Sequence, residues 1–193
     1  MDKIKEKPSV MQLEEELKRE RYKRSYRATL KSMIYTLIVV AAISVLVATF
    51  CLPVLQIYGS SMNPTLQDGE VVVSVNTDKL ESGDILAFYY NNKIMVKRVI
   101  ARAGDWVDFD RDGTVYVNAV PVDEPYLTEK AFGECDIKLP YQVPHGEIFV
   151  MGDHRSTSID SRSMAIGCVK DEQIVGKVIF RIWPLKRIGT ISD

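Results

Sequence analysis

The sequence predicts a mostly β protein, in which an antiparallel sheet or barrel-like domain follows one N-terminal transmembrane helix. Two observations predict this architecture. A long run without charged residues precedes position 57, and the chain beyond it consists of short runs rich in Val, Ile and aromatic residues, punctuated by Gly, Pro and Asn. A length of 193 residues suits one globular domain with appendages.

The membrane-spanning segment is expected at residues 32–56. Nineteen of the 23 residues that begin at Met33 are apolar, and none of the 23 is charged. As a helix this run would be about 33–35 Å long, which is enough to cross a hydrocarbon core of ~30 Å. The apolar core of a cleaved signal peptide is much shorter, roughly 7–15 residues. We therefore expect a retained single-pass anchor that ends near Pro53.

The charge distribution predicts how the anchor is inserted. Residues 1–31 carry ten Lys and Arg against six Asp and Glu, whereas residues 32–193 carry fifteen against twenty. Because basic flanks stay on the cytoplasmic side, we expect a cytoplasmic helical head at 1–31 and an extracytoplasmic domain at 57–193. The protein is then held at the plasma membrane, with the lipid bilayer as a partner. We expect no nucleic-acid partner, since the basic charge is not spread over the folded part.

The domain is expected to consist of short strands in a fixed order. Runs with the composition of strands lie at residues 70–75, 84–90, 93–102, 147–153 and 177–184. Asn91-Asn92 predicts a tight turn, and Asp112-Gly113 predicts a hairpin within 106–120. Residues 121–146 contain four prolines, and we interpret them as a meandering loop or small subdomain, a variable insert.

The three cysteines leave one question open. Cys51 lies in the expected span, and Cys135 and Cys168 lie in the domain. Outside the cell these two form either a disulfide or two separate, half-buried thiols. Because neither CxxC nor a His/Cys zinc spacing is present, no metal site is expected, and no other cofactor is expected either.

Candidate nucleophiles are the two serines of GSSMN (residues 59–63), shortly after the span. A serine hydroxyl needs a base, and the stretch departs from the G-x-S-x-G motif at Asn63. His154 lies beside two acidic residues of the same loop and could complete a triad, although a loop histidine that bonds its neighbours is the preferred interpretation. Taken alone, such a serine pair is more often an interfacial turn than a nucleophile.

Lys97 is a second candidate base. Side chains alternate between the faces of a strand, so Lys97 and Arg98 point in opposite directions and cannot both lie on a solvated face. One of them is expected to enter an apolar setting, where desolvation would lower the pKa of a lysine from ~10.4. An exposed lysine at a strand edge is the alternative.

The third candidate cluster is the loop MGDHRSTSIDSR, residues 151–162. Its acidic and basic residues predict a polar loop braced by Asp–Arg pairs: Asp153, Arg155, Asp160 and Arg162. Ser158 would then be placed to accept a hydrogen bond from a lysine amine.

In this order behind one span, the three clusters resemble the type I signal peptidases of the Gram-positive branch, which belong to peptidase family S26. The resemblance extends from about residue 57 to residue 189, with a gap near 121–146. It is carried by YGSSMNPTL with QDGE, SGDILAF, VKRVIARAGD, GTVYVN, MGDHRSTSIDSR and GKVIFRIWPLKRIG.

The resemblance implies a membrane-anchored serine endopeptidase that cleaves N-terminal signal peptides from exported preproteins after small residues of the Ala-x-Ala type. Ser61 would be the nucleophile, Lys97 the general base, and Ser158 the residue that orients Lys97. Apolar subsites would be lined by Ile57, Met62, Leu66, Met95 and Val96. The partners implied are signal peptides, in the neighbourhood of the secretion translocase, and the protein is expected to be a monomer.

Two departures from the family pattern concern the site. His154 stands where many members have Asn, which we expect to affect loop geometry more than chemistry. Gly59 stands where some members have a serine that contributes a hydroxyl to the oxyanion hole. The oxyanion is then expected to bind the backbone N–H of Ser61, helped by Ser60 or water.

Two other functions fit the same topology. A sortase-like cysteine transpeptidase would use Cys168 with His145 or His154. A non-catalytic, membrane-anchored β module would use none of these groups.

Overall fold

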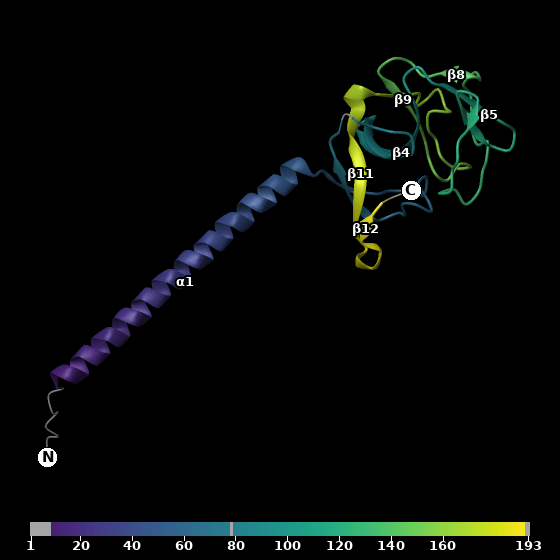
Figure 1. The fold of residues 1–193 in the computed structure, drawn as a ribbon. Helices are drawn as coiled ribbons and strands as arrows, with labels where there is room; N and C mark the ends of the chain where they lie inside the picture. The colour runs from purple at the N-terminus through teal and green to yellow at the C-terminus, as the bar shows by residue number, and fades with distance from the viewer. Residues whose placement is uncertain (1–8, 78, 192–193) are drawn as a thin grey trace. The chain divides into compact units, whose positions relative to one another are not determined.

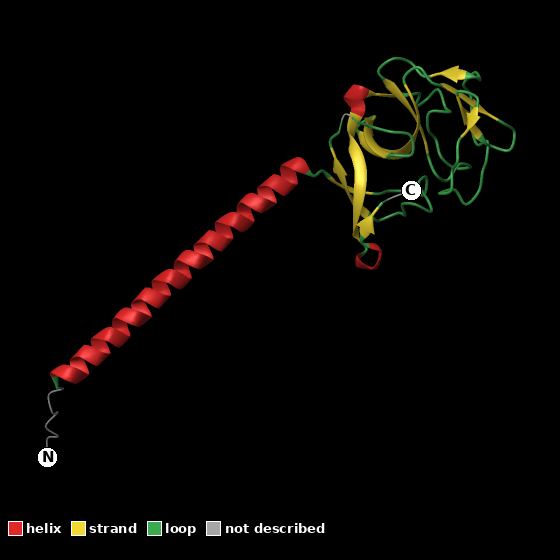
Figure 2. Ribbon diagram, viewed as in Figure 1, coloured by secondary structure: helices red, strands yellow, loops and turns green. Residues whose placement is uncertain are grey.

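The structure, a computed structural model, describes residues 9–77 and 79–191, without the side chains of residues 48–51. The chain divides into two compact units, which meet between Ala48 and Thr49. The first contains helix α1 as far as Ala48; the helix itself comprises Val10–Cys51, and Figure 2 shows it as one continuous helix. By length and composition α1 is able to cross a membrane.

The end of the expected span is not helical. Helix α1 ends at Cys51, and Val54–Gln56 form strand β1, which pairs with β2 (Val71–Val75). The last residues of the segment 32–56 therefore belong to the β unit.

The second unit is built from two antiparallel sheets, which confirms the predicted fold class (Figure 1). The larger sheet has the order β1-β2-β11-β3-β4-β9-β10, with β12 paired to β11, and the smaller has the order β7-β6-β5-β8. The remaining strands of the larger sheet are β3 (Ile85–Tyr90), β4 (Lys93–Arg102), β9 (Glu147–Met151), β10 (Val169–Lys170), β11 (Ile174–Trp183) and β12 (Gly189–Thr190). The smaller sheet contains β5 (Trp106–Phe109), β6 (Val115–Val117), β7 (Val120–Pro121) and β8 (Tyr141–Gln142), and two 3-10 turns lie at Asp171–Gln173 and Leu185–Arg187.

Local sequence determines the turns. Asn91 and Asn92 adopt φ angles of 45° and 61°, as the tight turn between β3 and β4 requires. Gly113 adopts a φ of 84° in the predicted hairpin between β5 and β6. The expected strand 93–102 coincides with β4.

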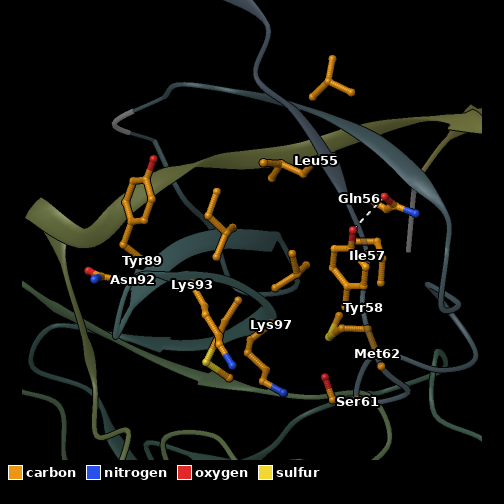
Figure 3. Close-up of a pocket in the computed structure, with 15 residues that line it drawn as sticks. Leu55, Gln56, Ile57, Tyr58, Ser61, Met62, Tyr89, Asn92, Lys93 and Lys97 are labelled. Atoms are coloured by element: carbon orange, nitrogen blue, oxygen red, sulfur yellow. Dashed lines mark hydrogen bonds between the residues drawn. The ribbon is translucent and has the colours of Figure 1, made fainter.

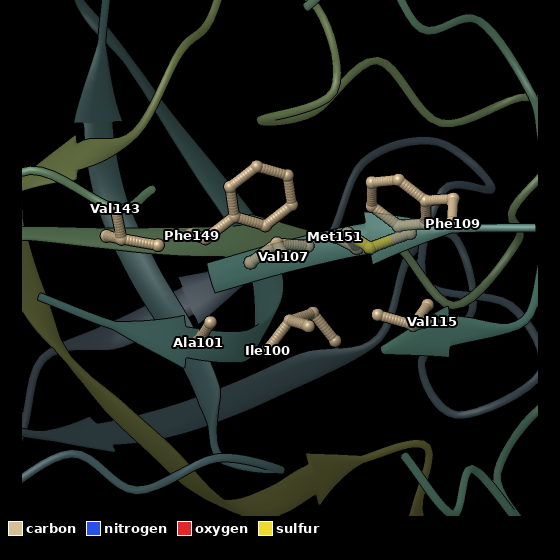
Figure 4. Packing of buried hydrophobic residues seen from close by; sticks show 8 residues of the cluster. All are labelled: Ile100, Ala101, Val107, Phe109, Val115, Val143, Phe149 and Met151. Carbon is tan, nitrogen blue, oxygen red and sulfur yellow. The ribbon is translucent and has the colours of Figure 1, made fainter. Parts of the chain in front are cut away.

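The core that supports the site lies between the two sheets (Figure 4). Strands β4 and β9 contribute residues from one side, and β5 and β6 contribute residues from the other. The buried cluster consists of Ile100, Ala101, Val107, Phe109, Val115, Val143, Phe149 and Met151. This packing fixes the C-terminal end of β9, where the loop 151–162 begins.

Strand register then places the candidate residues together. Arg98 of β4 is paired with Met151, the last residue of β9. Lys97 therefore lies directly beyond the end of β9, where the chain leaves the sheet. The residues between β1 and β2, which include Ser61, form the other side of the site.

Candidate active site

The turn that carries Ser61 is closed at its base by backbone hydrogen bonds. The N–H of Ile57 donates to Glu70 O at 2.8 Å, and the N–H of Gly69 donates to Ile57 O at 2.9 Å. Gly59 has a φ of 87° and donates its N–H to Asp68 Oδ1 at 2.7 Å. Glycine adopts this conformation without steric cost, so Gly59 shapes the turn at the position where it lacks a hydroxyl.

The same turn is held to β11 by a buried carboxylate. Glu70 lies 2.9 Å from Arg181 Nε and 2.6 Å from Arg187 Nη1. Arg181 also donates to Thr65 O at 2.6 Å. The position of Ser61 is therefore fixed by contacts that the sequence motifs alone did not indicate.

Lys97 and Arg98 are both buried, with 2% and 1% of their surface exposed. The alternative of an exposed lysine at the strand edge is wrong. We expected at least one of the two cations to be buried, and the structure buries both. Arg98 donates Nε to Asp153 Oδ1 at 2.9 Å and Nη2 to Oδ2 at 2.8 Å, which satisfies its charge. Lys97 has no comparable carboxylate contact among the hydrogen bonds of the described residues; its Nζ donates to Ser158 Oγ at 2.9 Å.

Burial lowers the pKa of Lys97 to about 8. Desolvation is the largest cause, because a charged amine is poorly solvated inside the domain. The charges of Asp160 and Asp153 raise the pKa and that of Arg162 lowers it. The neutral amine is thus accessible near physiological pH.

Lys97 and Ser61 line one cavity of about 870 Å³. Figure 3 shows the Lys97 amine and the Ser61 hydroxyl pointing toward each other. Further lining residues that the sequence pointed to are Ile57, Gly59, Met62, Met95 and Val96. A hydroxyl, an amine of lowered pKa and an apolar groove are the components of an acyl-transfer site.

Two predicted residues lie elsewhere. Ser60 is exposed and Leu66 is completely buried in the core behind Met62, and neither lines the cavity. The cavity walls also include residues that sequence reasoning missed: Val54, Leu55, Gln56, Tyr58, Tyr89, Asn92, Lys93 and Ile94. Val54, Leu55 and Gln56 were missed because they continue the uncharged run that predicts the span.

The loop that follows β9 is braced by ion pairs, but mostly not by those expected. The pair between Asp160 and Arg162 lies within the loop, with Arg162 Nε 2.9 Å from Asp160 Oδ1. Asp153 instead pairs with Arg98 of β4, and it also accepts a hydrogen bond from Thr65 of the turn that carries Ser61.

The partner of Arg155 is Glu124, which lies in the insert from which no motif could be transferred. Both side chains are buried. The signal that could have indicated this residue is an acidic side chain inside a proline-rich stretch, which is too common to be specific.

Gly152 lets the two sides of the site approach closely. A Cβ at this residue would lie 2.2 Å from Ser158 Oγ and 2.5 Å from Ser61 O. The next turn of the loop is held by the N–H of His154, which donates to Ser61 O at 3.0 Å. The His154 side chain bonds Thr157 Oγ1 of the same loop at 2.6 Å; that its departure from the family pattern affects loop geometry more than chemistry stays a prediction.

Cys135 and Cys168 form no disulfide with each other, and both are free thiols. Burial raises the pKa of Cys135, and it raises that of Cys168 to about 11. A cysteine nucleophile needs a lowered pKa, and neither residue lines the cavity. In the described part of the chain, no three His, Cys, Asp or Glu side chains are grouped as a metal ion would require.

Comparison with known proteins identifies the family. Residues 30–183 match the family described as "Signal peptidase, peptidase S26". The chain belongs to this family. It is therefore a serine endopeptidase, which rules out the cysteine transpeptidase and the non-catalytic module.

Named relatives agree with this membership. Signal peptidase IB of Staphylococcus aureus (strain COL) is 40% identical over 171 residues, covering 78% of this chain and 88% of the relative. Signal peptidase I of Bacillus caldolyticus is 40% identical over 147 residues, covering 68% and 79%. A crystal structure of a signal peptidase I from Enterococcus faecalis V583 aligns with a TM-score of 0.45 and 30% identity, covering 53% of this chain and 98% of that one.

The geometry at Gly152 predicts the effect of one added methyl group. Gly152→Ala should lower peptidase activity about tenfold or more, because the new Cβ must displace Ser158 Oγ or the Ser61 backbone. The measurement is kcat/KM on a preprotein in detergent. Ser156→Ala, at an exposed position of the same loop, should leave kcat/KM within about twofold; equal activities of the two variants would contradict this account.

Proposed function

We propose that this enzyme cleaves N-terminal signal peptides from exported preproteins with a Ser–Lys dyad, in which Ser61 is the nucleophile and Lys97 the general base. The observation that carries the proposal is the burial of Lys97, with its lowered pKa, in the cavity that Ser61 also lines. Family membership and the relatives' names, signal peptidase I and IB, support the substrate class.

The first half of the reaction forms an acyl-enzyme. Neutral Lys97 accepts the Ser61 proton while Ser61 Oγ attacks the carbonyl carbon of the residue before the cut. The backbone N–H of Ser61 binds the oxyanion of the tetrahedral intermediate. As the C–N bond breaks, the Lys97 ammonium donates its proton to the leaving amine.

The second half releases the signal peptide. Lys97, neutral again, accepts a proton from a water molecule that attacks the acyl carbon. The ester bond to Ser61 breaks, and the proton returns to Ser61 Oγ. Both halves use the same amine, so no cofactor takes part in the proposed reaction.

Ser158 determines which way the lone pair of Lys97 points. Its hydroxyl oxygen accepts from Lys97 Nζ at 2.9 Å, and the Asp160 carboxylate, whose pKa the Ser158 hydroxyl helps to lower, attracts the proton of that hydroxyl. Burial alone would raise the pKa of Asp160, but hydrogen bonds and the charge of Arg162 hold it below its usual value. Ser158 therefore has no proton to offer the lone pair of Lys97, which stays available for Ser61.

The cavity suits a small, apolar residue before the cut. Ile57, Met62 and Val96 give it apolar walls beside the Ser61 hydroxyl. We infer that these side chains select the small residues of an Ala-x-Ala ending. The monomeric state and the neighbourhood of the secretion translocase stay predictions.

The membrane orientation is proposed from charge. Helix α1 supplies an apolar stretch long enough to span the bilayer, and the basic head at 1–31 keeps the N-terminus in the cytoplasm. The domain that begins at residue 57 then faces the side on which exported proteins emerge.

Replacing either member of the dyad should abolish cleavage. Ser61→Ala and Lys97→Met should each lower the rate roughly 10⁴-fold or more, because each removes a group that the bond-making step requires. The measurement combines single-turnover cleavage of a preprotein with mass determination of the cut. Unchanged unfolding midpoints are the control for folding, and substantial processing by either variant would refute the dyad.

The pH profile should show the titration of Lys97. Since the base must be uncharged, kcat/KM should rise about tenfold per pH unit below a pKa of about 8 and level off above it. The profile is measured on a preprotein in detergent from pH 6 to pH 10. His154→Ala should leave the acid limb in place, and a limb that this variant abolishes would assign the base to the histidine.

Orientation is testable by labelling. In a Cys51→Ser, Cys135→Ser, Cys168→Ser background, a membrane-impermeant maleimide should label Thr128→Cys on intact spheroplasts. It should label Ser25→Cys only after the membrane is permeabilised. Both positions are exposed in the structure, and the reverse pattern would overturn the orientation.

A further inference from the structure

The insert contacts all three buried arginines that surround the active site. We call residues 124–136 the clamp segment. Glu124 pairs with Arg155, the Tyr126 ring lies 3.7 Å from the guanidinium carbon of Arg98, and Phe132 O accepts from Arg162 Nη1 at 2.7 Å. Tyr126 also donates its hydroxyl to Glu124 Oε1 at 3.0 Å, which connects two of these contacts.

The clamp segment approaches the catalytic loop as closely as the backbone allows. A Cβ at Gly133, where φ is 64°, would lie 2.5 Å from Arg162 Nη1 and 2.6 Å from Arg155 O. The N–H of Asp136 donates to Arg162 O at 3.1 Å, and its carboxylate accepts from the N–H of Met164 at 2.5 Å. Both charged side chains and backbone therefore hold the loop from this side.

We propose that Glu124 is a positioning residue of the catalytic apparatus: by pairing with Arg155 it fixes Gly152, and through Gly152 it fixes Ser158 relative to Ser61 and Lys97. This inference rests on the proposed Ser–Lys function. It assigns a role in the reaction to the insert, in which no family motif is recognised.

The connection from Glu124 to the dyad consists of direct contacts. Arg155 Nε donates to Gly152 O at 3.0 Å, and the Gly152 N–H donates to Asp160 Oδ2 at 2.9 Å. The Cα of Gly152 lies so close to Ser158 Oγ and Ser61 O that no side chain fits at this position. A shift of Arg155 must therefore move the residue that separates the nucleophile from the group that orients its base.

Removal of the Glu124 carboxylate leaves the guanidinium of Arg155 buried and without its ion-pair partner. An unpaired buried guanidinium draws in water or moves toward it. The loop would then close less tightly over Lys97, whose lowered pKa depends first on burial. The charged groups acting on Lys97 are Asp160, Arg162 and Asp153, and a change at Glu124 leaves all three in place.

The test compares Glu124→Gln with Glu129→Gln in the full-length protein in detergent. Both changes remove one carboxylate from the clamp segment, but Glu129 is exposed whereas Glu124 is buried. For Glu124→Gln we expect kcat on a preprotein to fall at least tenfold with KM within about twofold, and the acid limb of the pH profile to move upward by about half a unit or more. Glu129→Gln should match the parent protein in kcat, in KM and in the position of the acid limb.

A double-mutant cycle tests whether Glu124 acts through Arg155. In an Arg155→Ala background, Glu124→Gln should lower kcat less than about twofold further, because the charge that needs the carboxylate is gone. A full tenfold loss in that background would place the effect of Glu124 outside Arg155 and overturn the proposal.

The outcomes separate this inference from the proposed function. If Ser61→Ala and Lys97→Met are inactive but Glu124→Gln matches Glu129→Gln, only the inference fails. If the dyad variants keep processing, the proposed function fails first. If Glu124→Gln yields no folded protein, the same measurements are made on Glu124→Asp, which moves the carboxylate back by one methylene. A loss of kcat in Glu124→Asp without a shift of the acid limb would indicate general damage and overturn the proposal.

Discussion

The structure depends on keeping Lys97 away from water while charged groups surround it. An amine loses its proton at a lower pH when solvent cannot stabilise the ammonium form. In this protein burial provides that condition, and the loop after β9 provides much of the burial, since Ser158 lies directly against the amine. Whatever holds that loop in place therefore also sets the pKa of Lys97, the proposed base.

Buried ion pairs hold the loop, and two of them connect it to different parts of the chain. Asp153 reaches β4 and the turn that carries Ser61 through Arg98 and Thr65, and Arg155 reaches the insert through Glu124. A buried ion pair adds little net stability compared with a packed apolar pair, but the loss of one partner is strongly destabilising. Such pairs consequently define a single arrangement of the loop more than they increase the free energy of unfolding.

Local pattern was sufficient for most of the fold and for the chemical groups of the site. Strand β4 and the turn at Asn91-Asn92 follow from residue type alone. The ends and partners were harder to predict, because they depend on contacts distant in sequence. Val54–Gln56 continue the uncharged run of the expected span, yet they pair with β2. Glu124 has nothing local to distinguish it from other acidic loop residues, and its importance is evident only once Arg155 is known to be buried against it.

A loop closed by apolar side chains would bury Lys97 equally well, but it could not orient the amine. To orient the Lys97 amine, the loop must offer it a hydrogen-bond acceptor. Ser158 is such an acceptor only if its own hydroxyl proton is directed to a group other than Lys97. Asp160 supplies that group. A lone carboxylate so near the amine would raise the pKa of Lys97 and keep it charged, and Arg162 opposes this effect by lowering it. In the proposed reaction, Asp160 thereby helps to direct the lone pair of Lys97, and Arg162, which pairs with Asp160, offsets the effect of the Asp160 charge on the pKa of Lys97.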